Sequence, residues 1–269
     1  MTFLVTLFAL MTERFFDWSH LRNWHWVVTA QYVIAKYSRL SPALNLVILL
    51  SGISIVWLMI SSLIANSFFG LLYLLISYFV LIYCLGPKNF WASSFAEMNA
   101  LTFAQTTHNL NIKLPEIASQ LDPSVQLFLA AYQRVFAVIV SYLLFGILGA
   151  IIYRSLLTLA EQEETDHFYF NRLWARNLLS YADWLFIRLF IALFALGDNM
   201  QRTWHVMREK ALHDLTSSWA LLVETSQLAL QAQTLWQPND INNMRRAVQI
   251  IDKTCILLLT LTAIGVIVF

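Results

Sequence analysis

The sequence predicts an all-α fold, a polytopic membrane helical bundle with four or five transmembrane helices plus interfacial and amphipathic surface helices. Hydrophobic residues make up 59% of the chain and charged residues 12%, with a mean hydropathy of +0.62, whereas a soluble domain is about a quarter charged. Apolar runs of about 20 residues, the length that crosses a bilayer, recur along the chain. Ten Trp and ten Tyr suit the membrane–water interface. The whole chain, residues 1–269, is predicted to form a single membrane domain.

Composition and spacing exclude several classes of function. The net charge of +1 comes without a basic stripe or a nucleic-acid-binding motif, so no nucleic acid is expected as a partner. Seven glycines and the lack of a Gly-rich phosphate loop exclude the ordinary nucleotide-binding modules. Cys84 and Cys255 fall within apolar runs and are expected to be core residues. His20 and His25 are five apart and no His/Cys cluster has ligand spacing, so no metal site is predicted.

The first half of the chain predicts membrane anchoring. Thr2–Met11 has about half the length of a span, and the Trp-rich stretch Asp17–Tyr37 has the composition of an interfacial helix. Pro42 suits the first turn of a helix, and residues 44–65 and 68–85 are predicted to form a transmembrane hairpin. The hairpin contains no ionisable residue, which favours anchoring over transport, since transporters place broken helices or charges near the membrane midplane.

The central segment is predicted to enter the membrane as one uninterrupted helix. Asp122 can cap a helix whose first residue is Pro123, and this helix continues into a span at residues 135–153. Gly146 and Gly149 give that span a flat face, which favours close packing against another helix.

The last part of the chain predicts three further segments. Residues 184–196 form either a fifth span or an interfacial segment. Residues 201–235 carry apolar positions with a helical period and are predicted to form an amphipathic helical region. The terminal span is assigned to residues 250–269, because the apolar run reaches the required length only if it begins near Ile250.

Charged side chains in apolar helices are the candidate functional residues, because an ionisable group at membrane depth needs a partner or a hydrated cavity. Arg154, Asp183 and Arg188 meet this description. Two of them also have a purely structural interpretation: Arg154 can extend from a helix end to the interface, and Asp183 can cap the first turn of its helix. Asp183 and Arg188 lie five residues apart, about 140° round a helix, so their partners are expected on other helices.

One face of the helix around Arg188 is suited to an anion. Four polar or aromatic residues recur at intervals of four and share this face: Arg176, Ser180, Trp184 and Arg188. Arg188 lies one turn from Trp184, close enough to stack on the indole, and its planar fork of donors suits a phosphate or a lipid headgroup. The predicted anion-binding residues are Arg154, Arg176 and Arg188, with Tyr153, Ser180 and Trp184 in support.

The order and spacing of four segments together point to a known family. The segments are Thr12–Phe16, Phe145–Arg154, Ala182–Leu189 and Ala247–Phe269. They resemble, respectively, the Glu-Arg-aromatic element, the Gly-x-x-Gly-Ala-x-x-Tyr-Arg helix, the Asp-Trp-x-Pro-x-Arg-Leu element and the terminal anchor of the AmpE family. These inner-membrane regulatory proteins are related to the CobD/CbiB synthases of cobalamin assembly. Two departures matter: Phe186 replaces the proline, and the Asp-Asp and Asn-Thr-x-Asp-Ser-Met clusters of the synthases are missing after the Tyr-Arg pair.

The resemblance implies a non-enzymatic accessory or signalling protein of the bacterial inner membrane. It would act with a cytoplasmic peptidoglycan-recycling amidase in β-lactamase regulation and would retain an anion-binding site, with no cofactor assigned. The alternative is a membrane-bound transferase or ligase of the CobD/CbiB (adenosylcobinamide-phosphate synthase) type, using a nucleotide with Mg²⁺. There, Arg154 and Arg188 would hold an anion, and Asp183 or Glu13 would act as base or magnesium ligand. Membrane lipids and a second copy of the chain are further expected partners.

Two topologies place the candidate residues on opposite sides of the membrane. Five spans with the N-terminus inside put most Lys and Arg on the cytoplasmic side, which the positive-inside rule favours over the weaker bias of four spans. Five spans, however, place Arg154 and Asp183 towards the outer face. The resemblance to a nucleotide-using synthase places both residues inside.

Overall fold

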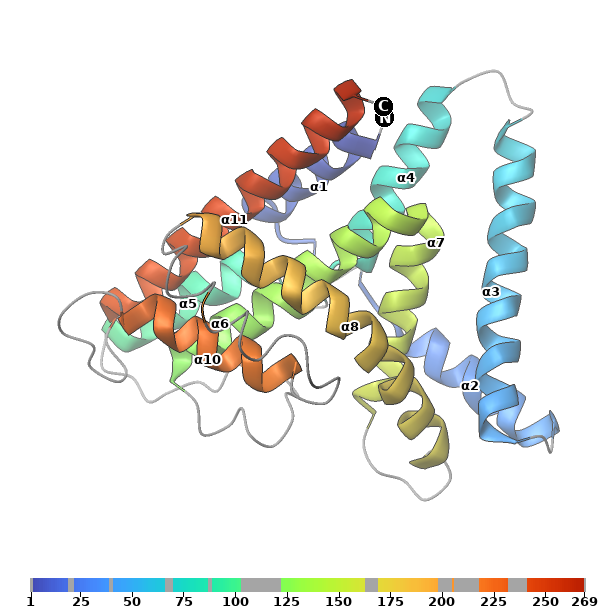
Figure 1. The fold of residues 1–269 in the computed structure, drawn as a ribbon. Helices are drawn as coiled ribbons and strands as arrows, with labels where there is room; N and C mark the ends of the chain where they lie inside the picture. The colour runs from blue at the N-terminus through green and yellow to red at the C-terminus, as the bar shows by residue number, and fades with distance from the viewer. Residues whose placement is uncertain are drawn as a thin grey trace. The chain divides into compact units, whose positions relative to one another are not determined.

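The structure is a computed structural model and describes residues 2–18, 22–38, 41–65, 70–86, 89–102, 122–162, 169–197, 205, 218–231 and 241–268. Every regular element in these ranges is a helix, so the predicted all-α class is confirmed. The elements (Figure 1) are α1 (Thr2–Phe15), α2 (His25–Ser38), α3 (Pro42–Ala65), α4 (Gly70–Cys84), α5 (Phe90–Thr102), α6 (Pro123–Ala131), the π-helix η3 (Tyr132–Phe136), α7 (Ala137–Ala160), α8 (Tyr169–Gly197), α10 (Ser218–Gln231) and α11 (Ile241–Val268).

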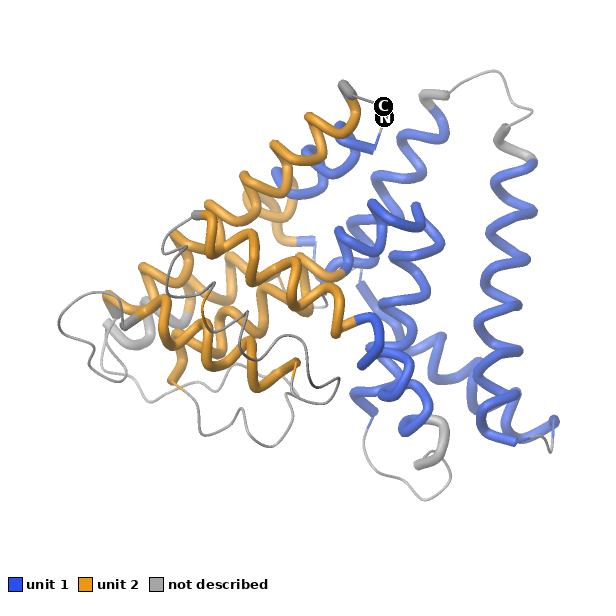
Figure 2. The backbone as a smooth tube through the Cα atoms, in the orientation of Figure 1, with its two compact units in different colours: residues 1–11, 18–87, 138–182 blue, residues 12–17, 88–137, 183–269 orange. Residues whose placement is uncertain are grey.

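The chain divides into two compact units, coloured blue and orange in Figure 2. Unit 1 consists of Met1–Met11, Trp18–Pro87 and Val138–Ala182, and unit 2 consists of Thr12–Asp17, Lys88–Ala137 and Asp183–Phe269. The long helices α7 and α8 each contribute residues to both units.

Four helical segments in the described part of the chain are long and apolar enough to cross a membrane. They are Pro42–Ser62, Pro123–Ala160, Arg172–Leu196 and Asn242–Val266. Leu72–Cys84 is apolar but shorter. These lengths and compositions support a multi-pass membrane protein.

Three of the predicted spans differ in extent from the helices that contain them. Residues 68–85 correspond to α4, which has 15 residues and is shorter than the roughly 20 residues of a full crossing. Residues 184–196 are the second half of α8, and the complete helix is long enough to span. Residues 250–269 belong to a helix that begins earlier, at Ile241, because the polar residues before Ile250 continue it without a break.

The predicted amphipathic region 201–235 is described only in part. Ser218–Gln231 forms α10, so a helix is confirmed there. The remainder of 201–235, apart from His205, lies outside the described residues.

In unit 1, α2 packs against α3, and α3 packs against α4. The start of α2 is fastened to the last turn of α4 through Tyr83. The indole Nε1 atoms of Trp24 and Trp26 donate to the carbonyl and the hydroxyl of Tyr83, each at 3.2 Å. The Tyr83 hydroxyl donates in turn to the carbonyl of Asn23. The Trp residues predicted to lie at the membrane interface therefore also fix one helix to another.

Unit 2 is built around α6, which packs against α5, α10 and α11. The predicted cap of this helix is confirmed: Oδ1 of Asp122 accepts a hydrogen bond from the amide of Ser124 at 2.9 Å, and Pro123 occupies the first turn. The cap satisfies one of the backbone N–H groups that a helix start leaves without a partner.

The core of unit 2 is aromatic. The rings of Phe136 and Phe190 have centroids 4.7 Å apart, and those of Phe128 and Phe194 are 5.7 Å apart. All four side chains are buried. Large aromatic rings bury much apolar area each, so these contacts bind the helix that begins at Pro123 to the second half of α8.

The predicted span at 135–153 lies within the candidate span Pro123–Ala160, but the expected lack of a break is wrong: α7 breaks at Gly146 and changes direction within the helix (Figure 1). Gly146 has φ +66° and ψ −155°, a backbone region open almost only to glycine. A Cβ added there would meet nothing within 4 Å, whereas one added at Gly149 would lie 2.2 Å from the carbonyl oxygen of Ser141. Gly146 therefore allows the helix to bend. Gly149 allows the residues after the bend to approach the backbone of Ser141, so the two glycines serve a bend within one helix and not a flat face for another helix.

Replacing Gly146 with alanine should destabilise the protein by about 1–3 kcal/mol, because a side chain disfavours this backbone conformation. Gly52→Ala is the matched control: Gly52 lies in α3 with open space around it and no positive φ, so its replacement should be neutral or stabilising by about 0.5–1 kcal/mol. Thermal unfolding of both variants in detergent measures the difference. Equal unfolding temperatures would contradict a break at Gly146.

Candidate functional site

A π-helical turn interrupts the long helix of unit 2 at Tyr132–Phe136. Such turns are rare and occur frequently at functional sites. This one buries three successive polar side chains, Tyr132, Gln133 and Arg134, which are 0%, 6% and 6% exposed. Buried polar groups need hydrogen-bond partners, and the partner of Tyr132 is one of the predicted site residues.

Asp183 accepts a hydrogen bond from Tyr132. The Tyr132 hydroxyl donates to Oδ1 of Asp183 at 2.6 Å, and Asp183 is 1% exposed. An O–H···O contact of this length to a carboxylate is of the strong, charge-assisted kind. Asp183 lies in the middle of α8, far from its first residue Tyr169, so it does not cap the first turn. Its contact instead holds the π turn against α8.

Aromatic rings enclose this hydrogen bond. The Tyr132 ring meets Trp219 edge-on at 5.4 Å and lies 5.9 Å from Phe190 and 6.5 Å from Phe136. An apolar enclosure of this kind lowers the local dielectric constant and strengthens the hydrogen bond within it. It also raises the cost of leaving Asp183 without its donor.

The guanidinium of Arg188 lies over an indole ring. Its Cζ lies 4.2 Å from the centroid of Trp184, which confirms the predicted stacking. Nη1 donates to the carbonyl of Trp184 at 2.7 Å and to the Oγ of Ser218 at 3.3 Å. Arg188 is only partly buried, so its guanidinium is oriented by these contacts and still accessible.

Asp183 and Arg188 belong to one cluster, because neighbouring residues of α10 link the two side chains. Ser218 accepts a hydrogen bond from Arg188, and the next residue, Trp219, contacts the tyrosine that donates to Asp183. Each charged residue therefore has a partner on another helix, as the angle between them round α8 predicts. All members of this cluster lie in unit 2.

The other predicted site residues are distributed over both units. Glu13 is buried in unit 2 near the end of α1, and its carbonyl accepts a hydrogen bond from Asn89 at 2.5 Å. Four residues belong to unit 1: Tyr153, Arg154, Arg176 and Ser180. Of these, Tyr153 and Arg154 are buried, Arg176 is exposed, and the hydroxyl of Ser180 donates to the carbonyl of Asn177.

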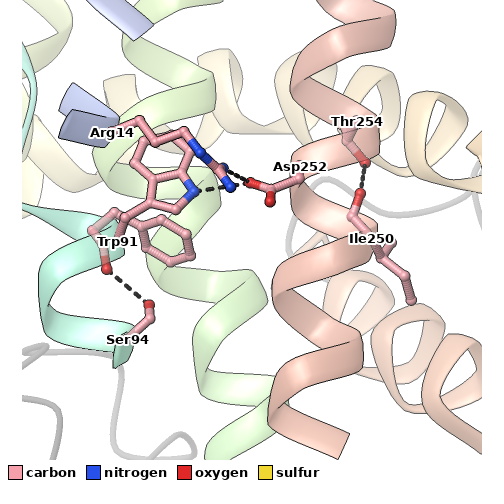
Figure 3. Close-up of polar contacts among 7 residues, drawn as sticks. Arg14, Trp91, Ser94, Ile250, Asp252 and Thr254 are labelled. Atoms are coloured by element: carbon pink, nitrogen blue, oxygen red, sulfur yellow. Dashed lines mark hydrogen bonds and ion pairs between the residues drawn. The ribbon is translucent and has the colours of Figure 1, made fainter. Parts of the chain in front are cut away.

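Sequence reasoning missed an ion pair on the terminal helix (Figure 3). Nη1 of Arg14 lies 2.5 Å from Oδ1 of Asp252, which also accepts a hydrogen bond from Nε1 of Trp91 at 2.9 Å. Asp252 lies inside the candidate span Asn242–Val266. A usable signal was present, because an acid three residues into the predicted span at 250–269 needs a partner. Nothing local in the sequence identified Arg14 as that partner.

The arrangement of Arg188 and Asp183 is better suited to binding an anion than to catalysing a reaction of that anion. Arg188 offers an oriented donor fork, whereas Asp183 is enclosed with Tyr132. Among the described residues, no group of three or more His, Cys, Asp or Glu is placed to hold a metal ion.

Tyr132→Phe should destabilise the protein by about 1.5–3 kcal/mol, the scale of a hydrogen bond to a charged group. Thermal unfolding in detergent measures this change. Tyr37→Phe serves as control, because Tyr37 is 76% exposed and its hydroxyl is expected to contribute little. If the two variants lost the same stability, the Tyr132–Asp183 bond would have no special weight.

The Arg14–Asp252 pair tests whether Asn242–Val266 crosses the membrane. A pair in water weakens as the Debye length falls from about 30 Å at 0.01 M salt to about 3 Å at 1 M, whereas a pair at membrane depth is shielded from the ions. We expect the coupling energy from an Arg14→Gln/Asp252→Asn double-mutant cycle in lipid nanodiscs to stay constant over this range. A coupling that vanishes in high salt would place Asp252 in water.

Comparison of the chain with protein-family models, with curated proteins and with solved structures found no match. The resemblance to the AmpE family therefore stays a hypothesis carried by the four sequence segments. The geometry around Arg188 and Asp183 is a second and separate source of support for a function.

Proposed function

We propose that this protein is a membrane accessory protein that holds a phosphate-bearing ligand at Arg188 and does not convert it. One observation carries the proposal: the guanidinium of Arg188 lies 4.2 Å above the Trp184 ring, is anchored to Ser218 and remains partly accessible. The ring contact and the two hydrogen bonds of Nη1 hold the guanidinium in place, so less conformational entropy is lost when an anion binds.

The geometry of Asp183 supports binding without turnover. Transfer of a phosphoryl group requires a positioned base or metal in addition to donors. A base must reach the reacting proton directly or through one water. Asp183 is 1% exposed and its Oδ1 is engaged by Tyr132, so its position favours a structural role within the cluster.

The biological setting of the proposal rests on the sequence resemblance. The Asp-Trp-x-x-x-Arg element that builds the Arg188 site is one of the four segments that resemble the AmpE family. We therefore place the protein in a bacterial inner membrane, acting with a cytoplasmic peptidoglycan-recycling amidase in β-lactamase regulation. The alternative, a CobD/CbiB-type transferase, requires Asp183 to become accessible.

Arg188→Ala should weaken binding of the phosphate-bearing ligand by about 1.5–3 kcal/mol, because a hydrogen-bonded charge is removed. Arg188→Lys should recover only part of the affinity, since the ammonium lacks the planar fork. Thermal-shift titration of the purified protein with ATP, phosphatidylglycerol and a muropeptide identifies the ligand class and measures the affinities. Arg245→Ala is the control, because Arg245 is an exposed arginine of unit 2 on another helix.

The same preparations test for turnover. Incubation with ATP and Mg²⁺ should release no phosphate above background. Phosphate release that Asp183→Asn abolishes would overturn the accessory function and favour the transferase. Equal affinities of Arg188→Ala and the wild-type protein for every ligand would overturn the binding site itself.

A further inference from the structure

The ion pair between Arg14 and Asp252 in unit 2 leaves hydrogen-bonding capacity unused (Figure 3). Nη1 of Arg14 and Nε1 of Trp91 meet the same carboxylate oxygen, Oδ1 of Asp252, at 2.5 and 2.9 Å. Within the described part of the chain, no hydrogen bond reaches Oδ2 of Asp252 and none leaves Nη2 of Arg14. A guanidinium has five N–H donors and a carboxylate about four acceptor sites, so both side chains can bind a further group.

The ion pair is also incompletely covered. The side chains of Arg14 and Asp252 are 41% and 23% exposed, although Asp252 lies inside the candidate span Asn242–Val266. Lipid tails offer neither donors nor acceptors, so a charge exposed to them is costly. A partly exposed ion pair in a membrane-spanning helix therefore needs a cover that supplies polar partners.

Each of the three helices joined by these contacts, α1, α5 and α11, also exposes a large apolar side chain near the ion pair. On α1 it is the residue after Arg14, and on α5 and α11 it lies one helical turn after Trp91 and Asp252. The three exposed side chains are Phe15, Phe95 and Ile256. A charged centre with apolar neighbours suits a second membrane-embedded surface, because polar contacts between helices and close packing hold membrane helices together.

We propose that the ion-pair surface binds a second copy of the chain; this surface consists of Arg14, Asp252, Phe15, Phe95 and Ile256. Its charge pattern selects the partner. An anionic headgroup would be attracted by Arg14 and repelled by Asp252, whereas a partner that carries both signs matches both charges. One cation beside one anion is such a partner for itself, because in a two-fold dimer residue i meets residue j and j meets i. All five residues belong to unit 2.

The direction of the ion pair agrees with a two-fold dimer in a membrane. Both copies insert with the same orientation, so the two-fold axis between them runs along the membrane normal. The pair runs from the end of α1 across to α11 (Figure 3). That axis can therefore place Arg14 of each copy opposite the partner's Asp252, where the unused donors and Oδ2 form charge-assisted hydrogen bonds across the interface. The proposal does not rest on the role of Arg188.

The test uses the full chain, expressed with two different affinity tags in one cell and extracted in an uncharged detergent. It measures how much of one tagged form is captured with the other, and wild-type copies should capture one another. Arg14→Asp makes both charges of the surface negative and Asp252→Arg makes both positive. Either variant alone should lose capture at least about tenfold, the scale of one charge-assisted hydrogen bond. Co-expression of the two variants should restore capture, because every charge then faces an opposite one.

Three further variants separate a lost interface from a lost fold. Arg14→Asp/Asp252→Arg in one chain keeps an ion pair within the chain and should capture itself like the wild-type protein. Arg14→Gln/Asp252→Asn removes both charges without adding repulsion and should capture itself at least about tenfold less. Lys36→Asp is the control for a charge reversal outside the surface, because Lys36 is an exposed cation of unit 1, and it should behave like the wild-type protein.

The proposal is overturned if wild-type copies do not capture one another, or if the uncharged Arg14→Gln/Asp252→Asn variant captures itself as well as the wild-type protein does. It is also overturned if co-expression of the two charge-reversed variants restores no capture. A monomeric wild-type protein whose unfolding temperature rises with phosphatidylglycerol and not with phosphatidylcholine would assign the exposed guanidinium to a lipid headgroup instead.

Discussion

The hydrogen bond from Tyr132 to Asp183 is the contact on which the candidate site of unit 2 depends. It joins a π turn to the middle of α8 and is enclosed by aromatic rings on both helices. Because a buried carboxylate is tolerated only with a donor, the contact fixes which turn of α8 faces the core. Arg188, five residues further along the helix, is thereby directed towards α10, where the Oγ of Ser218 accepts a hydrogen bond from it.

The same requirement recurs at two further charged residues of unit 2. Asp252 meets Arg14 and Trp91, and Arg134 donates to Ser93 at 3.4 Å. In each case the partner comes from a different helix, so the polar contacts determine which helix faces lie together, while the aromatic side chains fill the space between them. Apolar side chains alone would specify such faces weakly, because lipid and protein interior are similarly apolar.

Local features of the fold were predictable from the sequence, and distant ones were not. The cap at Asp122 and the stacking of Arg188 on Trp184 depend on residues within one helical turn, and both were predicted. The partners Tyr132 and Ser218 lie 51 and 30 residues away from Asp183 and Arg188, and no periodicity identifies them. Gly149 permits a close approach, as predicted, although to the backbone of Ser141 in its own helix. Gly146 was misinterpreted, because a small residue that permits close packing and one that permits a positive φ look identical in a sequence.

The break at Gly146 changes how the chain is threaded through a bilayer. A straight helix over the 38 residues of Pro123–Ala160 would be about 57 Å long, nearly twice the roughly 30 Å of the hydrocarbon layer. The fold-back at Gly149, against the backbone of Ser141, means that the segment is not one rigid rod joining opposite faces. A helix that folds back covers less of the bilayer thickness than its 38 residues would if straight, so residue count alone overstates the reach of this segment.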